Sequence, residues 1–125
     1  MQVNRLQRTI AILEIKNGII CVRVLKGTRI TLAEAVEFVE ERVKLSAGRD
    51  SPMLIIDEGI ISIDKAARDY LTRDTNLEGL TALAVVSPTR FSQSLFNFFL
   101  KRTNPHIPHH VFTDHGEAIQ WLSRV

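Results

Sequence analysis

The order of apolar and polar residues first indicates a β-hairpin near the N-terminus. In residues 6–25, two runs rich in Ile, Leu and Val flank the pair Asn17-Gly18. Asn-Gly supplies the positive φ angles that a two-residue hairpin turn requires. Apolar and polar residues alternate imperfectly in both runs, so we expect both faces of these strands to be partly covered.

The apolar spacing then changes to a helical period over residues 31–48. Thr31 followed by Glu34 forms a capping-box pattern, and Gly48 is a typical helix stop. One narrow apolar arc of this helix consists of Leu32, Val36, Val39 and Val43. Phe38 and Leu45 lie beside this arc, where they either widen the core face or form a surface for a partner. We favour the wider core face.

The rest of the chain alternates between strands and helices. Residues 51–58 form a short, continuous apolar run, which is typical of a central parallel strand covered on both faces. Residues 79–87 have the same pattern, and residues 107–112 predict the last strand. Helices are predicted at 64–73, 91–102 and 113–125, with Asp64 as N-cap of the first and Thr113 as N-cap of the last.

This order predicts one α/β domain over residues 1–125. Strands joined through helices pair in parallel with right-handed crossovers. We therefore expect a mixed sheet of about five strands, with the N-terminal β-hairpin beside the parallel strands and with four helices. The length of 125 residues suits a single domain.

Composition and charge narrow the classes of function. The net charge is only +2 and basic residues interleave with acidic ones, so the one-sided basic patch of a nucleic-acid-binding protein is missing. The one cysteine, Cys21, cannot form an internal disulfide, and its apolar surroundings favour a buried thiol. The sequence shows no signal peptide and no apolar stretch of transmembrane length. We therefore expect a cytoplasmic bacterial protein that binds no nucleic acid and does not span a membrane.

Several residues match a known family pattern. They are Asn97-Phe98-Phe99-Leu100, Pro105, Ile107-Pro108, Val111-Phe112, Ala118 and Trp121-Leu122, together with Thr31-Leu32, Glu34-Ala35 and Ala67-Arg68-Asp69-Tyr70. With the predicted order of elements, they resemble the STAS fold, which anti-sigma-factor antagonists share with the cytoplasmic tails of sulfate transporters. More narrowly, nearly the whole chain is similar to small bacterial STAS-like proteins of unassigned function.

The regulatory motif of that family is changed in this chain. Anti-sigma-factor antagonists typically carry Asp-Ser-Ser-Gly at the start of the second helix, where phosphorylation of a serine disrupts the partner complex. The matching residues here are Asp64-Lys65-Ala66-Ala67, and the nearby Ser62 precedes the motif. The resemblance therefore implies the fold without the phosphorylatable serine.

Weak candidate binding residues lie at and after the end of the strand predicted over residues 51–58. Open α/β sheets bind ligands at the carboxyl ends of their strands. Asp57 and Glu58 occupy such an end, and Ser62, Asp64 and Arg68 follow closely in sequence. The alternative is a structural role, in which Asp64 caps the helix and Arg68 pairs with an acid.

A second weak candidate opens the third helix. Ser87, Thr89 and Arg90 precede or begin this helix, and helix N-termini attract anions. The alternative is a capped turn with Arg90 in solvent. No glycine-rich phosphate loop, nucleophile elbow or dinucleotide fingerprint is present, so we expect neither an enzyme nor a cofactor.

All four histidines lie close together, which raises the question of a metal site. A zinc site needs three or four ligands that converge at about 2 Å. Neighbouring residues of one strand point to opposite faces, and two prolines keep the approach to the strand extended. We therefore expect no metal to be bound by His106, His109, His110 and His115.

The third helix carries more apolar surface than one core stripe needs. On a helical wheel with Phe91 at 0°, Phe96 lies near about 140° and Leu100 near about 180°. The core stripe is predicted from Phe91, Leu95, Phe98 and Phe99. Either a neighbouring helix or a partner covers Phe96, and a second copy of the chain is the simplest partner. One hypothesis is therefore a homodimer face at Phe96 and Leu100.

Two functions remain open at this point. The first is a non-catalytic STAS-like protein-interaction or regulatory module that self-associates. The second is a domain that binds a small hydrophobic ligand or lipid, because STAS-like folds resemble CRAL-TRIO lipid-binding domains in topology. An apolar pocket beside Phe96 without a dimer would favour the second.

Overall fold

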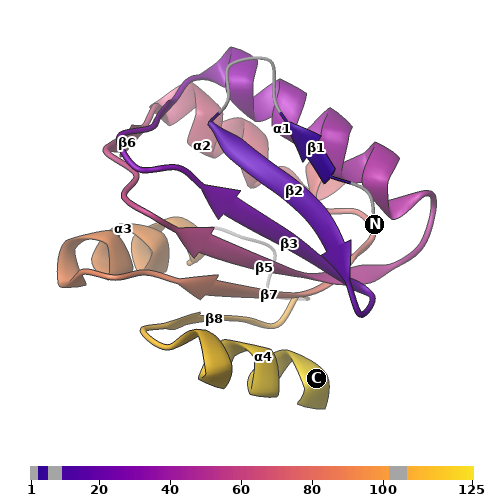
Figure 1. The fold of residues 1–125 in the computed structure, drawn as a ribbon. Coiled ribbons are helices and arrows are strands. Elements are labelled where there is room, and N and C mark those ends of the chain that lie inside the picture. The colour runs from indigo at the N-terminus through magenta and orange to yellow at the C-terminus, as the bar shows by residue number, and fades with distance from the viewer. Residues whose placement is uncertain (1–2, 6–9, 102–106) are drawn as a thin grey trace.

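The computed structural model describes residues 3–5, 10–101 and 107–125, and side chains among these except at 3–5, 91, 95, 98 and 99 (Figure 1). One mixed sheet has the strand order β1-β2-β3-β5-β7-β8. Its strands are β1 (Val3–Arg5), β2 (Ala11–Lys16), β3 (Ile19–Val24), β5 (Ser51–Asp57), β7 (Leu80–Val86) and β8 (His109–Phe112). The predicted mixed α/β sheet is confirmed, and the short β1 adds an antiparallel edge strand next to β2.

The hairpin forms where the sequence predicts it. Strands β2 and β3 pair antiparallel, and the pair Lys16↔Ile19 closes the turn. Asn17 has a φ of 52° and Gly18 a φ of 77°, the left-handed conformations that this tight turn requires. From β3 onward the neighbouring strands β5, β7 and β8 all pair in parallel.

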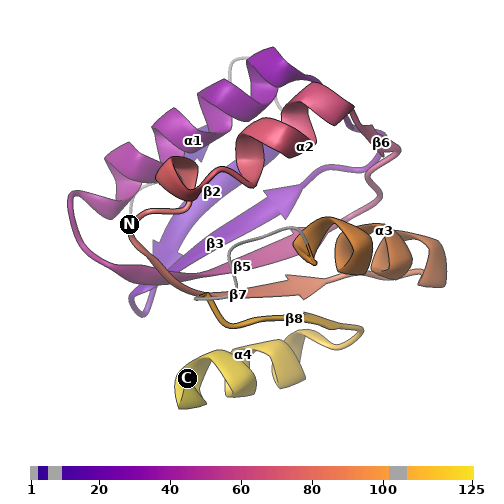
Figure 2. The same ribbon diagram turned by 180° about the vertical axis from the view of Figure 1, so that it is seen from behind.

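Four helices cover the sheet unequally. Helices α1 (Leu32–Ser46), α2 (Lys65–Leu71) and α3 (Arg90–Leu100) lie on one face, and α4 (His115–Arg124) lies on the other, near β8 (Figures 1 and 2). A short 3-10 helix, η1 (Asp74–Asn76), follows α2. A two-stranded parallel sheet of β4 (Arg29–Ile30) and β6 (Ser62–Ile63) connects the loops before α1 and α2.

Successive side chains of the central strands point alternately into two separate apolar layers. Met53 and Leu83 point into the large core beneath α1, α2 and α3. Leu54 and Ala84 point the other way, into a smaller cluster with Ala118 of α4. Both faces of β5 and β7 are therefore buried, which explains their continuous apolar sequences.

Helix α1 buries a different face from the one predicted. Leu32 and Val43 are exposed at 43% and 51%, whereas Leu45 is only 2% exposed. The true core face consists of Ala35, Phe38, Val39, Arg42, Leu45 and Ser46. This face is rotated by about 90° from the predicted arc. The apolar pattern did not reveal it, because small residues and the aliphatic stem of an arginine occupy part of the face. Phe38 and Leu45 thus belong to the wider core face that we favoured.

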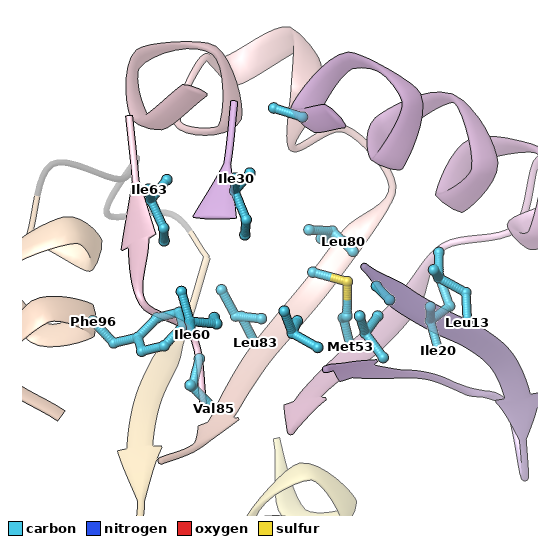
Figure 3. Close-up of a cluster of buried hydrophobic side chains, with 14 of the residues drawn as sticks. Leu13, Ile20, Ile30, Met53, Ile60, Ile63, Leu80, Leu83, Val85 and Phe96 are labelled. Carbon is cyan, nitrogen blue, oxygen red and sulfur yellow. The ribbon is translucent and has the colours of Figure 1, made fainter. Parts of the chain in front are cut away.

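Helix α3 also differs from the wheel prediction. Phe96 and Leu100 are exposed at 4% and 2%, inside the same core as Ile60 and Val85, and Figure 3 shows Phe96 beside Ile60. The predicted dimer face at Phe96 and Leu100 is therefore wrong, because other parts of the same chain cover both side chains. The core stripe predicted at Phe91, Leu95, Phe98 and Phe99 lies outside the described side chains.

The last helix begins one residue later than predicted. Asp114, and not Thr113, is the N-cap of α4, and its Oδ2 atom accepts a hydrogen bond from the Glu117 backbone N–H at 2.9 Å. The negative charge of an aspartate at this position also interacts favourably with the positive end of the helix dipole.

Candidate functional site

The carboxyl ends of β5 and β7 bring together two of the predicted site residues. Asp57 is 3% exposed, and its Oδ1 atom accepts the backbone N–H groups of Gly59 at 2.8 Å and Ile60 at 2.7 Å. The hydroxyl of Ser87, which is fully buried, donates to Asp57 Oδ2 at 3.3 Å. The polar atoms of this pair are thus engaged within the chain.

The neighbouring candidates do not join this pair. Glu58 lies 3.7 Å from Arg23 in an exposed ion pair. Asp64 is exposed at the N-cap of α2, and Arg68 donates to the Ile63 carbonyl at 2.5 Å, so the expected pairing of Arg68 with an acid is not what the structure shows. Ser62 is half-buried in β6, opposite Arg29 of β4. Within the described part of the chain, no hydrogen bond or ion pair links Asp57 to Asp64 or Arg68.

The start of α3 is a capped turn. The Thr89 hydroxyl accepts from the Ser92 backbone N–H at 3.1 Å, and the Gln93 side chain donates to the Ser87 carbonyl at 3.2 Å. Arg90 is exposed beside this turn. The Ser92 backbone N–H is therefore already bonded within the turn.

The described histidines make different contacts and do not form a cluster. His109 Nδ1 is 3.0 Å from the Ile107 carbonyl, whereas the His110 ring packs on Phe112 with ring centroids 4.6 Å apart. His115 is exposed in the first turn of α4, and His106 lies outside the described residues. Among the residues with described placement, no three His, Cys, Asp or Glu side chains gather as a metal ion requires.

A cavity of about 90 Å³ lies between the sheet and helices α1, α2 and α3. Figure 3 shows Ile30, Ile63, Met53 and Leu83 gathered around this region of the core. Phe96 and Leu100 also line it. Almost all of the wall is aliphatic or aromatic, so this interior space suits an apolar occupant.

The sequence of the wall explains why the space stays unfilled. Ala11, Val22 and Ala35 are buried at positions where a larger side chain would reach into the cavity. Protein interiors are otherwise close-packed, so a void of this size is uncommon. A small apolar ligand that fits would gain contacts with this apolar wall.

One charged residue stands in this wall. Arg42 of α1 is 1% exposed, and its Nη2 atom donates to the carbonyls of Asn76 at 3.0 Å and Glu78 at 3.2 Å. Burial lowers the pKa of its guanidinium. An arginine in a helix is normally expected at the surface, so Arg42 was not predicted as a buried residue. Its spacing of three residues from Val39 and Leu45 was the signal that could have indicated its position.

The opposite face of the sheet is only partly covered. Helix α4 packs on β5, β7 and β8, and Figure 1 shows it at the β8 end of the sheet, away from β2 and β3. Ile19, Cys21 and Ile56 are half-buried at the margin of this cluster. They form a second apolar surface, on the face of the sheet opposite the cavity.

A hairpin beside parallel strands, with helices on both faces, defines the SpoIIAA-like, or STAS-like, fold. The chain is similar to the crystal structure of an uncharacterized protein from the DUF3478 family, with a SpoIIAA-like fold, from Shewanella loihica PV-4. The TM-score is 0.65 at 16% sequence identity, covering 90% of this chain and 91% of that chain. The resemblance to the STAS fold is thereby confirmed at the level of the fold.

The chain belongs to the family described as Domain of unknown function (DUF7793), whose family model matches residues 13–125. No curated protein matches the chain. Across the described residues, no helix combines the length and the apolar character needed to cross a membrane.

Proposed function

We propose that the protein binds a small apolar ligand in the cavity between its sheet and helices α1, α2 and α3, on a non-catalytic STAS-like scaffold. The observation that supports this most is the apolar cavity of about 90 Å³ with Phe96 in its wall. Apolar cavities in proteins bind small apolar guests, such as xenon, and a larger cavity of about 150 Å³ also binds benzene. The location expected from the sequence, the cytoplasm of a bacterium, stays part of this proposal.

The proposal is tested by exposing the protein to xenon under pressure and following the methyl signals of Ile30, Val22 and Leu83 by NMR. We expect these signals to shift in the wild type. They should stay unchanged in Ala35→Leu, whose larger side chain fills the cavity from α1. Ala33→Leu, exposed on the same helix, is the matched control and should bind as the wild type does. Unmoved cavity signals in a folded wild-type protein would refute ligand binding.

Native mass spectrometry of the freshly purified protein adds a direct search for the natural ligand. A small molecule that remains bound in the wild type and is lost in Ala35→Leu would identify the occupant. The same spectrum reports whether the chain is monomeric or oligomeric, and therefore also bears on the second candidate.

The second candidate function is protein interaction, including homodimer formation. It rests on Ile19, Cys21 and Ile56, which stay half-buried where α4 leaves the sheet uncovered. Apolar area of this kind gains free energy when a partner covers it. This surface replaces the one predicted at Phe96 and Leu100, which lies in the core.

Light scattering separates the two candidates. If the chain self-associates through this face, Ile19→Lys combined with Ile56→Lys should reduce the measured mass to that of a monomer. Thr81→Lys, exposed on β7, should leave the mass unchanged. A wild-type protein that is monomeric at high concentration would rule out the homodimer.

A further inference from the structure

The side chains around the cavity give a ligand almost no polar contact. Among the described residues of its wall, the polar side chains are those of Arg42 and Asn76. Arg42 exposes almost no surface, and its Nη2 atom donates to the carbonyls of Asn76 and Glu78. The side-chain amide of Asn76 donates to the Tyr70 carbonyl at 2.7 Å. Both polar side chains therefore have backbone partners of their own.

The sheet beneath the cavity is equally closed to polar contacts. Strands β3, β5 and β7 pair with one another in parallel, so the ladder uses their peptide groups. Their side chains in the cavity wall include Val22, Met53 and Leu83, which are apolar and buried (Figure 3 shows the last two). A hydroxyl, amine or carboxyl group placed here would lose its water without gaining a partner, which is unfavourable.

The volume of the cavity limits the size of the ligand. The space measures about 90 Å³. A cavity of about 150 Å³ accommodates benzene, so each carbon atom needs roughly 25 Å³. By this scale, the space holds about three or four carbon atoms without expansion of the core.

We infer that the ligand is a hydrocarbon of about three or four carbon atoms that carries no hydrogen-bonding group. The inference rests on the ligand binding proposed above and narrows its ligand class. It also separates this cavity from a lipid site, because a lipid has a polar head and a longer chain. Neither the head nor the chain matches the apolar wall and the small volume described here.

A pair of probes with the same number of non-hydrogen atoms tests the absence of a polar group. The protein is titrated with n-butane and, separately, with 1-propanol, while the methyl signals of Ile30 and Leu83 are followed by NMR. We expect n-butane to shift these signals and 1-propanol to bind at least about tenfold more weakly, because its hydroxyl finds no partner in the cavity. Equal or tighter binding of 1-propanol would overturn the inference.

A series of increasing chain length tests the size. Propane and n-butane should shift the same methyl signals in the wild type. We expect n-hexane, and octanoate as a probe for lipids, to leave them unmoved up to the solubility limit, because neither fits the available volume. Binding of n-hexane or octanoate as tight as that of n-butane would refute the size limit and favour a lipid site.

Two identical substitutions show whether the wall of the cavity sets this limit. Val22 is fully buried in the wall, whereas Val43 is exposed on α1. Val22→Ala enlarges the cavity, so n-hexane should now shift the signals of Ile30 and Leu83. Val43→Ala should keep the limit of the wild type. A folded Val22→Ala protein that still excludes n-hexane would contradict the inference, and the wild-type series decides the question if this variant does not fold.

The failure of the inference and that of the proposed function can be told apart. If xenon shifts the cavity signals but propane and n-butane do not, the hydrocarbon inference fails, and the cavity remains a site for smaller apolar guests. If xenon and both hydrocarbons leave the signals of the folded wild type unmoved, the proposed function fails as well.

Discussion

Ser87, at the end of β7, donates its hydroxyl to the carboxyl group of Asp57, at the end of β5, with 3.3 Å between Ser87 Oγ and Asp57 Oδ2. The same carboxyl group accepts the backbone N–H groups of Gly59 and Ile60. Three hydrogen bonds thus connect two neighbouring parallel strands and the turn that leads toward β6. They make Asp57 a central element of the carboxyl edge of the sheet.

We predict that Asp57→Ala lowers the free energy of unfolding by about 2–4 kcal/mol, because two backbone N–H groups lose their acceptor in a buried region. Asp57→Asn keeps an acceptor oxygen and should cost clearly less, and Ser87→Ala should cost about 1 kcal/mol. Urea denaturation measures all three. An Asp57→Ala protein as stable as the wild type would show that the hydrogen bonds contribute little.

The corrected face of α1 gives a second prediction. Leu45→Ala should lower the free energy of unfolding by about 2–5 kcal/mol, because Leu45 is 2% exposed in the main core. Val43→Ala, on the same helix and 51% exposed, should change it by about 0.5 kcal/mol or less. Thermal or urea unfolding of the two variants decides between the observed face and the predicted arc, since an arc through Val43 requires a large loss of stability in Val43→Ala as well.

The difference between strands and helices explains how much the sequence could predict. Strands β5 and β7 are buried on both faces, so their continuous apolar runs predict them without knowledge of the neighbours. The buried face of a helix depends on where the sheet lies. Leu32 and Phe96 were therefore placed wrongly, the first inside and the second outside. The hairpin, the three parallel strands and the four helices followed from local patterns, whereas helix rotation is a property of tertiary packing. The short elements β1, β4, β6 and η1 were not predicted.

The cavity and Arg42 were missed for a related reason. The cavity arises from volume differences among Ala11, Val22, Ala35 and their neighbours, which no apolar/polar pattern records. Arg42 lies on the core face of α1, but its type indicates a solvent-facing position. By contrast, Asp57 was found as a candidate because it ends a buried strand, and Ser87 because it precedes the third helix.

A third prediction concerns the start of α1. Glu34 Oε1 accepts the Thr31 backbone N–H at 2.9 Å and the Thr31 hydroxyl at 3.0 Å. Glu34→Ala removes both bonds and should lower the free energy of unfolding by about 1 kcal/mol. Glu40→Ala, exposed farther along the helix, serves as the control for loss of a glutamate. Equal effects of the two substitutions in urea denaturation would contradict a specific capping role.

The fourth prediction concerns the pH dependence of stability through Cys21. Burial raises the pKa of the Cys21 thiol, Lys16 opposes this shift and Glu14 adds to it. The thiol of the unfolded chain ionises at about pH 8.5, which is a lower pH than the thiol of the folded protein requires. As the pH rises past that value, the unfolded state therefore loses the proton first and is stabilised relative to the folded state. The contribution of Cys21 is fully present below about pH 8.5 and decreases above it.

We therefore expect the wild type to lose stability between pH 7.5 and pH 9.5 relative to Cys21→Ala, which has no thiol to ionise. The loss should stay below about 1.4 kcal/mol per pH unit, the limit for one proton. Urea denaturation of both proteins at the two pH values measures the difference, and other titrating groups cancel in the comparison. If the two proteins change in parallel, the thiol ionises equally in the folded and unfolded states. In that case, the margin of the sheet beside α4 is more open to water than its burial indicates.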